Sequence, residues 1–302
     1  MKILVAADGS SHSQDAVNLL GRLRFPDHSE IELISVLEHP VVFAGSHGIR
    51  DRVTAVTESR QRRAAEAAVE ETRNLLADCH AHVTSSIHDG HPAEEILQRA
   101  ETMSADLIVA GSRGLSALDR FLLGSTTERL LKYAHCDVLV SRPAIPSVEP
   151  VRGDRLRILV AYDGSPAANG AIDDLVRLPI GAVSEVRIVT VLSLLKSFRL
   201  DILQHLSNEW ACEKETAEKS ALAAAARLEA VGYDRVQVRI EESDDVPHHL
   251  IELAESWPAD LLMTGANGHS RIDRFLLGSV SSRLTRHAPC AVWLTRDSHG
   301  ND

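Results

Sequence analysis

The chain has 302 residues, of which 44% are hydrophobic and 25% charged, and its formal net charge is −11. This length predicts about two domains, and this composition excludes a disordered or low-complexity chain. The acidic balance and the aromatic content of only 4% argue against a broad nucleic-acid surface, which needs a basic stripe or aromatic stacking platforms.

Apolar runs are short throughout the sequence. None approaches the ~18 residues that a membrane-spanning helix needs, and the first residues lead directly into a strand-like run without a signal peptide. We therefore expect a cytoplasmic protein without membrane association. The four cysteines form no CxxC or Cys/His spacing, so we expect neither a disulfide framework nor a metal site.

In the first half of the chain, short apolar runs alternate with amphipathic segments. The runs predict strands at Ile3–Ala7, Ile31–Val36, Val83–Ile87, Leu107–Ala110 and Val138–Val140. The segments predict helices after a cap at Ser10, Ser11 or Ser13, within 51–80, at Ala93–Glu101 and within 124–135. This alternation predicts an α/β domain with a parallel sheet and helices on both faces.

The second half repeats the first. ILVAADGS at residues 3–10 returns as ILVAYDGS at 158–165, and residues 111–140 align without a gap with 265–294, with 15 identities in 30 positions. Such a tandem duplication places two domains at 1–144 and 155–298. The segment Ser141–Arg157 between them, which contains three prolines and a glycine, predicts a stiff, solvated linker.

The repeat predicts the same order of elements in the second half. They lie at Ile158–Ala161, Val186–Val191, within 205–231, and at Val236–Ile240, His248–Ser256, Leu261–Thr264, Val280–His287 and Val292–Leu294. A parallel sheet of this kind binds ligands at the carboxyl ends of its strands, where the strand order reverses.

Spaced glycines follow the fourth strand of each half. Gly111 and Gly114 are followed, after nine residues, by Gly124-Ser125-Thr126, which begins a helix. Glycines admit a bulky anion close to the backbone, and a helix start offers free N–H groups, so the pattern predicts a phosphate cradle. The alternative is that these glycines serve only turns and tight helix–sheet packing. The second half repeats the spacing with Gly265, Gly268, Gly278, Ser279 and Val280.

This G-x2-G-x9-G-[ST] spacing, the acid of ADGS and YDGS, and a Cys-x-Val before the last strand resemble the universal stress protein family, in its ATP-binding class. The resemblance covers nearly the whole chain. It implies two Rossmann-like domains of the adenine nucleotide alpha hydrolase type, each with five parallel strands in the order 3-2-1-4-5. It also implies that domains pair, here within one chain, and it leaves a homodimer open.

The resemblance implies an adenine-nucleotide site in each half. Asp8 and Asp163 would contact adenine or ribose, with a helix N-cap as their alternative role. Val36 and Val191 would flank adenine, or be plain core. The implied binding residues are Asp8, Val36, Gly90, Gly111, Arg113, Gly114, Gly124, Ser125 and Thr126 in the first half, and Asp163, Val191, Gly265, Gly268, Gly278, Ser279 and Val280 in the second.

The two predicted sites differ in sequence. Arg113 adds a cation that Asn267 cannot supply, and Val280 lacks the hydroxyl of Thr126. The loop after the third strand contains Gly90 in the first half but carries the charged side chain of Asp245 in the second. We therefore expect tighter ATP binding in the first half.

The resemblance implies an ATP-dependent regulator of stress or dormancy. The sequence contains no GxxxxGK[ST] lysine and no evident base, so we expect little or slow hydrolysis and no efficient enzyme. Mg²⁺ would bind through the phosphates and a serine hydroxyl, with retained waters. Two alternatives stay open: a slow ATPase on the same fold, and an interaction module whose pockets are empty or hold AMP. The sequence names neither the stress signal nor a protein partner.

Overall fold

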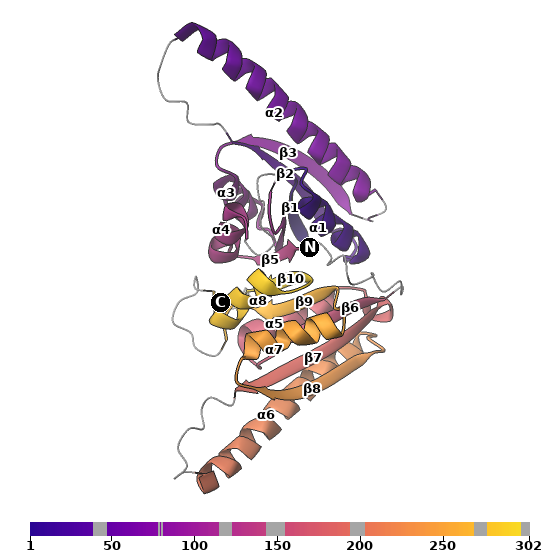
Figure 1. Cartoon of the computed structure of the whole chain (residues 1–302). Helices are drawn as coiled ribbons and strands as arrows, with labels where there is room; N and C mark the ends of the chain where they lie inside the picture. Colours follow the sequence, from indigo (N-terminus) through magenta and orange to yellow (C-terminus); the bar gives the residue numbers. More distant parts are fainter. Residues whose placement is uncertain are drawn as a thin grey trace. The chain divides into compact units, whose positions relative to one another are not determined.

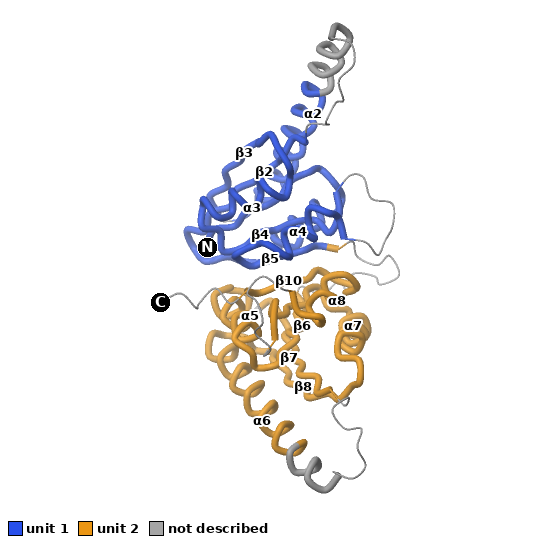
Figure 2. The backbone as a smooth tube through the Cα atoms, turned by 90° about the vertical axis from the view of Figure 1, so that its left-hand side faces the viewer, with its two compact units in different colours: residues 1–141 blue, residues 142–302 orange. Residues whose placement is uncertain are grey.

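A computed structural model describes residues 1–38, 47–77, 79, 81–114, 123–142, 155–193, 203–268 and 277–296. The chain divides into two compact units, unit 1 (residues 1–141) and unit 2 (residues 142–302), coloured separately in Figure 2. The predicted linker is shorter than the sequence suggested, because Ser141 ends a strand and the next strand begins at Leu156. Residues 143–154 lie outside the described part of the chain.

Unit 1 contains a parallel sheet. Its strands are β1 (Lys2–Ala6), β2 (Glu30–Leu37), β3 (His82–Asp89), β4 (Leu107–Gly111) and β5 (Asp137–Ser141). They are ordered β3-β2-β1-β4-β5, and every neighbouring pair is parallel. This is the predicted order 3-2-1-4-5.

Helices cover both faces of this sheet (Figure 1). They are α1 (Ser11–Arg22), α2 (His47–Leu75), α3 (Pro92–Met103) and α4 (Ser125–Tyr133). Helices α1 and α2 pack on one face, and α3 and α4 pack against each other on the opposite face. The long helix predicted within 51–80 begins earlier and ends earlier than expected, at Leu75.

Unit 2 repeats this architecture. Its strands are β6 (Leu156–Ala161), β7 (Ser184–Ser193), β8 (Val236–Ser243), β9 (Leu261–Gly265) and β10 (Ala291–Thr295), in the order β8-β7-β6-β9-β10 with parallel neighbours. Its helices are α5 (Pro166–Arg177), the 3₁₀ turn η1 (Gly181–Val183), α6 (Leu203–Ala230), α7 (Val246–Ser256) and α8 (Ser279–His287). The predicted fold class is therefore confirmed.

The core of each unit lies on both sides of its central strands. Ile3, Leu4 and Val5 of β1 are fully buried, as is Ile158 of β6. Such strands have apolar residues at every position because helices cover both of their faces. The edge strands β3 and β8 are half-exposed. Among the described residues, no helix combines the length and apolar character needed to cross a membrane.

Candidate functional site

The strand order reverses between β1 and β4 in unit 1. The chain runs from β1 outward to β2 and β3, then returns to place β4 on the other side of β1. Ligands of open α/β sheets bind in the crevice at the carboxyl ends of the strands, at this reversal. The loops that follow β1 and β4 are the ones in which the sequence analysis placed most candidate residues.

The turn after β1 is built by the Asp-Gly-Ser sequence. Gly9 has φ +75°, which favours glycine, and the Ser10 N–H donates to Asp8 Oδ1 over 2.9 Å. The N-cap of α1 is Ser10, whose Oγ accepts from the Ser13 N–H at 3.2 Å. Asp8 is therefore not the helix cap, and the residue is exposed.

Asp8 meets the loop after β4. A Cβ placed on Gly114 would lie 2.9 Å from Asp8 Oδ2, so a side chain at 114 would displace the carboxylate. The Ser10 hydroxyl also donates to the Arg113 carbonyl over 3.2 Å. The structure thus brings together two candidates, Asp8 and Gly114, that lie far apart in the sequence.

Unit 2 repeats this contact. The Ser165 N–H donates to Asp163 Oδ1 over 2.9 Å, and a Cβ on Gly268 would lie 2.9 Å from Asp163 Oδ2. The Ser165 hydroxyl caps α5 by accepting from the Ala168 N–H at 3.2 Å. Both units therefore present an exposed carboxylate beside a glycine of the loop that follows the fourth strand.

Gly111 and Gly265 have a packing role. A Cβ on Gly111 would lie 2.8 Å from the α1 backbone at His12 and Ser13. A Cβ on Gly265 would meet Ala167 of α5 at 2.8 Å. Approaches this close leave no room for a side chain, so the first glycine of each motif is explained by helix–sheet packing.

Gly124 differs, because neither its conformation nor its packing requires glycine. It has φ −66° and ψ 150°, which any residue adopts, and an added Cβ would make only ordinary contacts, the nearest at 3.5 Å. It is the N-cap of α4 and supplies no side-chain hydrogen bond to the helix start. The adjacent Ser125 is exposed and Thr126 is half-buried. The residues at this helix start are thus open to a ligand.

The start of α8 in unit 2 is similar but more apolar. Gly278 is its N-cap with φ −60°, and Ser279 is exposed. Val280, at the position of Thr126, packs against the apolar core of unit 2. Val191 packs against the same core, whereas Val36 in unit 1 is half-buried near the carboxyl end of β2.

Arg113 is not an exposed cation. The residue is 8% exposed, whereas the sequence analysis proposed it as a cation near phosphate. Its counterpart Asn267 is half-buried. The role of Arg113 as a cation near phosphate stays a prediction.

The loops after β3 and β8 also differ. Gly90 has φ +151° and donates its N–H to the Leu37 carbonyl over 3.0 Å. Asp245 is instead the N-cap of α7, accepting from the His248 N–H at 3.1 Å, and pairs with Arg283 at 2.9 Å. These two partners hold the pKa of Asp245 below its usual range. The sequence analysis anticipated the charge of Asp245 but neither partner.

Cys136 and Cys290 are buried, and burial raises the pKa of the Cys290 thiol to about 12, so this thiol is unreactive at neutral pH. The described residues contain no group of three or more metal-ligating side chains.

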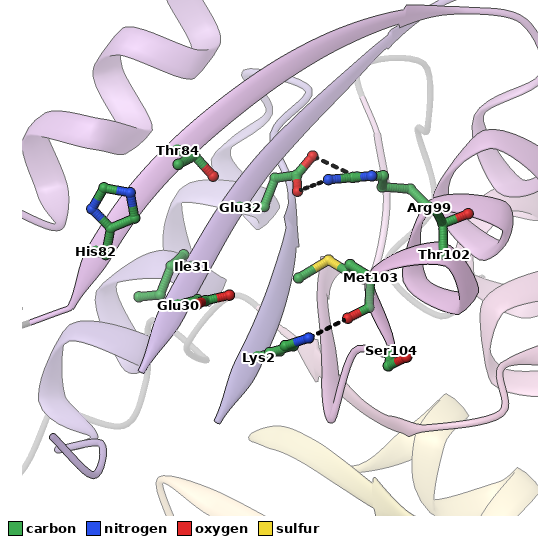
Figure 3. A pocket seen from close by; sticks show the side chains of 10 residues that line it. All are labelled: Lys2, Glu30, Ile31, Glu32, His82, Thr84, Arg99, Thr102, Met103 and Ser104. Carbon is green, nitrogen blue, oxygen red and sulfur yellow. Dashed lines mark hydrogen bonds and ion pairs between the residues drawn. The ribbon is translucent and has the colours of Figure 1, made fainter. Parts of the chain in front are cut away.

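A groove of about 290 Å³ lies at the opposite edge of the unit 1 sheet, at the amino ends of β1, β2 and β3 (Figure 3). None of the predicted binding residues lines it. Three of its charged side chains already have partners, since Arg99 binds Glu32 and the Lys2 amine donates to the Met103 carbonyl. This groove is therefore separate from the crevice at the carboxyl ends.

The model of the universal stress protein family matches residues 1–142 and 155–296. The chain belongs to the universal stress protein family. A universal stress protein of Mycolicibacterium smegmatis is 29% identical over 303 residues, which cover 97% of this chain and 96% of that protein. One of Methanocaldococcus jannaschii is 31% identical over 140 residues, covering 46% of this chain and 80% of that protein.

The fold has a solved counterpart. The crystal structure of a universal stress protein from Archaeoglobus fulgidus is 23% identical, covers 98% of both chains and has a TM-score of 0.62. This likeness supports the tandem arrangement of two family domains. Both units of this chain therefore carry the family fold, with the exposed carboxylate and open helix start described above.

Proposed function

We propose that this universal stress protein binds ATP at the crevice of each unit and acts as a nucleotide-dependent regulator in stress or dormancy. The observation that carries the proposal is Gly124. Neither the backbone conformation nor the packing requires glycine at this position, and the glycine leaves the start of α4 open to an anion.

The described residues of unit 1 fit such a nucleotide. The free N–H groups at the start of α4, with the hydroxyls of Ser125 and Thr126, would hold the phosphates. The Asp8 carboxylate would accept from a ribose hydroxyl or from the exocyclic amine of adenine, and Val36 would flank the base. The glycine at 114 keeps that carboxylate accessible.

Unit 2 would hold a second nucleotide with Asp163, Gly268, Gly278 and Ser279. We propose weaker binding there, because Val280 offers no hydroxyl and packs into the core. Bound nucleotide would supply phosphates that carry Mg²⁺, and the chain would contribute binding and orientation. We propose slow hydrolysis at most, since the sequence lacks a P-loop lysine.

Native mass spectrometry of the purified chain, followed by identification of nucleotide released by heating, tests this function. ATP at one or two molecules per chain is the expected result, and ADP would favour the slow ATPase. A chain that is empty and also ignores added ATP with Mg²⁺ would favour an interaction module and contradict the proposal.

We also propose a cellular location and a mode of domain assembly. We place the protein in the cytoplasm, which cell fractionation checks. We also propose that family domains pair, within one chain or between two chains. Light scattering at several protein concentrations separates these cases, because only a homodimer dissociates on dilution.

A further inference from the structure

Helix α3 packs on the unit 1 sheet through an ion pair. Glu32, on β2, is 8% exposed and lies under Arg99 of α3 (Figure 3). The two side chains form a bidentate pair, with N···O distances of 2.8 and 2.6 Å. Paired geometry of this kind fixes both the position and the orientation of the guanidinium.

Further hydrogen bonds continue from this pair toward the carboxyl edge of the sheet. The Ser86 hydroxyl donates to Glu32 Oε1 over 2.9 Å, and His88 Nε2 lies 3.2 Å from Ser86 Oγ. The other ring nitrogen of His88 lies 3.2 Å from the Glu95 carboxylate on α3. Five side chains from two strands and one helix thus form one continuous polar network.

The network ends against the Gly90 turn. A Cβ on Gly90 would lie 2.8 Å from Glu95 Oε1, so the carboxylate occupies the space beside this glycine. The φ of +151° restricts the position to glycine. The turn joins β3 to α3 at the carboxyl edge, where Val36 pairs in register with His88.

Unit 2 has a different pair at the same place. Glu241 stands at the strand position of His88, since it pairs with Val191 as His88 pairs with Val36. The N-caps His91 and Asp245 align the third helices, so Glu95 corresponds to His249 and Arg99 to Leu253. His249 Nε2 lies 3.8 Å from Glu241 Oε2, so the histidine and the acid have exchanged elements. With Arg187 at the position of Glu32 and Leu253 at that of Arg99, the described residues of unit 2 contain no counterpart of the Glu32–Arg99 pair.

We propose that His88 and Glu95 are positioning residues that hold the Gly90 turn in the shape required by the nucleotide of unit 1. This inference rests on the proposed function. A turn that is already ordered spares the ligand the entropy of ordering it. Removing either side chain breaks the link between Gly90 and the Glu32–Arg99 pair, and the loss of about one hydrogen bond weakens ATP binding roughly three- to tenfold.

The experiment uses the full chain carrying Gly278→Ala, which confines binding to unit 1. ATP affinity is measured by calorimetry for His88→Ala, Glu95→Ala and His88→Gln, and the amide resonance of Gly90 is recorded without nucleotide. The matched control is Glu241→Ala, at the corresponding position of unit 2.

We expect both alanine variants to shift the Gly90 resonance and to weaken binding. Glutamine at 88 retains an N–H donor for the Glu95 carboxylate, so we expect it to restore part of both effects, and the control changes neither. An unmoved Gly90 resonance, or unchanged affinity despite a shifted resonance, would overturn the proposal. If the parent chain binds no ATP, the proposed function fails, while the resonance still shows whether the pair holds the turn.

Discussion

Units 1 and 2 share their sheet order and the contact between an aspartate and a loop glycine, but they differ beneath the third helix. In unit 1 the buried Glu32 of the sheet pairs with Arg99 of this helix, whereas in unit 2 Arg187 stands at the position of Glu32 and the apolar Leu253 at that of Arg99. The same backbone fold thus accommodates different side-chain contacts between the third helix and the sheet. The comparison teaches that chemistry near the crevice can change without altering the fold.

In unit 2 the contact between the sheet and the region of the third helix includes an aromatic side chain. Trp257 is 8% exposed, and the Arg187 guanidinium, at the strand position of Glu32, lies 4.1 Å from the centre of a Trp257 ring. Leu250 and Ala254 fill the remaining space under α7. Unit 2 therefore gains packing where unit 1 retains polar groups.

A charge placed in the apolar core of unit 2 gives the largest expected effect. Leu250→Glu buries a carboxylate in an apolar core without a partner, and we expect it to lower the free energy of unfolding of unit 2 by about 3–5 kcal/mol. All three tryptophans of the chain lie in unit 2, so their fluorescence during urea unfolding reports on this unit alone. Glu95→Leu, in the third helix of unit 1, should change the stability of that unit far less, because Glu95 is half-exposed. Equal losses would contradict the comparison.

Acid is expected to weaken unit 1 through Glu32. The Arg99 guanidinium holds the pKa of this carboxyl below its usual range, so the pair stabilises the fold above the unfolded pKa of ~4.3. This stability is lost as the pH falls through the lower native pKa. Glu32→Gln should cost about 1.5–3 kcal/mol at pH 7 and reduce the acid dependence. Amide exchange in β2 between pH 7 and 3 measures both, and an unchanged pH profile would refute the assignment.

A smaller effect is expected at Asp245. Asp245→Ser keeps a side-chain cap for α7 but removes the charge, so it separates the two roles. We expect ATP to bind unit 2 about twofold more tightly, a modest gain because the carboxylate is already paired with Arg283. Titration of a chain carrying Gly124→Ala isolates this site. Weaker binding would show that the carboxylate does not hinder the nucleotide.

Much of the fold could be predicted from the sequence because apolar runs and amphipathic segments alternate so regularly. The internal repeat then predicts the second domain, although the sequence analysis gives no residue range for α5. The Ser165 cap and the proline at 166 are sequence signals that predict the start of this helix. Element ends were less predictable: α2 stops at Leu75, and Leu76 turns into the core at 1% exposure.

The candidate site could be predicted only in part. The carboxylate beside a loop glycine follows from strand order, which brings the turns after β1 and β4 together. Sequence spacing could not separate the roles of Gly111 and Gly124. A Cβ added to Gly111 would clash with the backbone of α1, whereas a Cβ added to Gly124 would make only ordinary contacts. Glu95 was missed because its partner His88 depends on how α3 lies on β3.

The most direct measurement is calorimetric titration of the full chain with ATP and Mg²⁺, alongside Gly124→Ala and Gly278→Ala. An added Cβ makes ordinary contacts at Gly124, so this variant should fold while its new methyl group blocks the phosphates. We predict two binding events in the parent chain, with the tighter one lost in Gly124→Ala and the weaker one lost in Gly278→Ala. Retention of the tighter event in a folded Gly124→Ala chain would contradict the account.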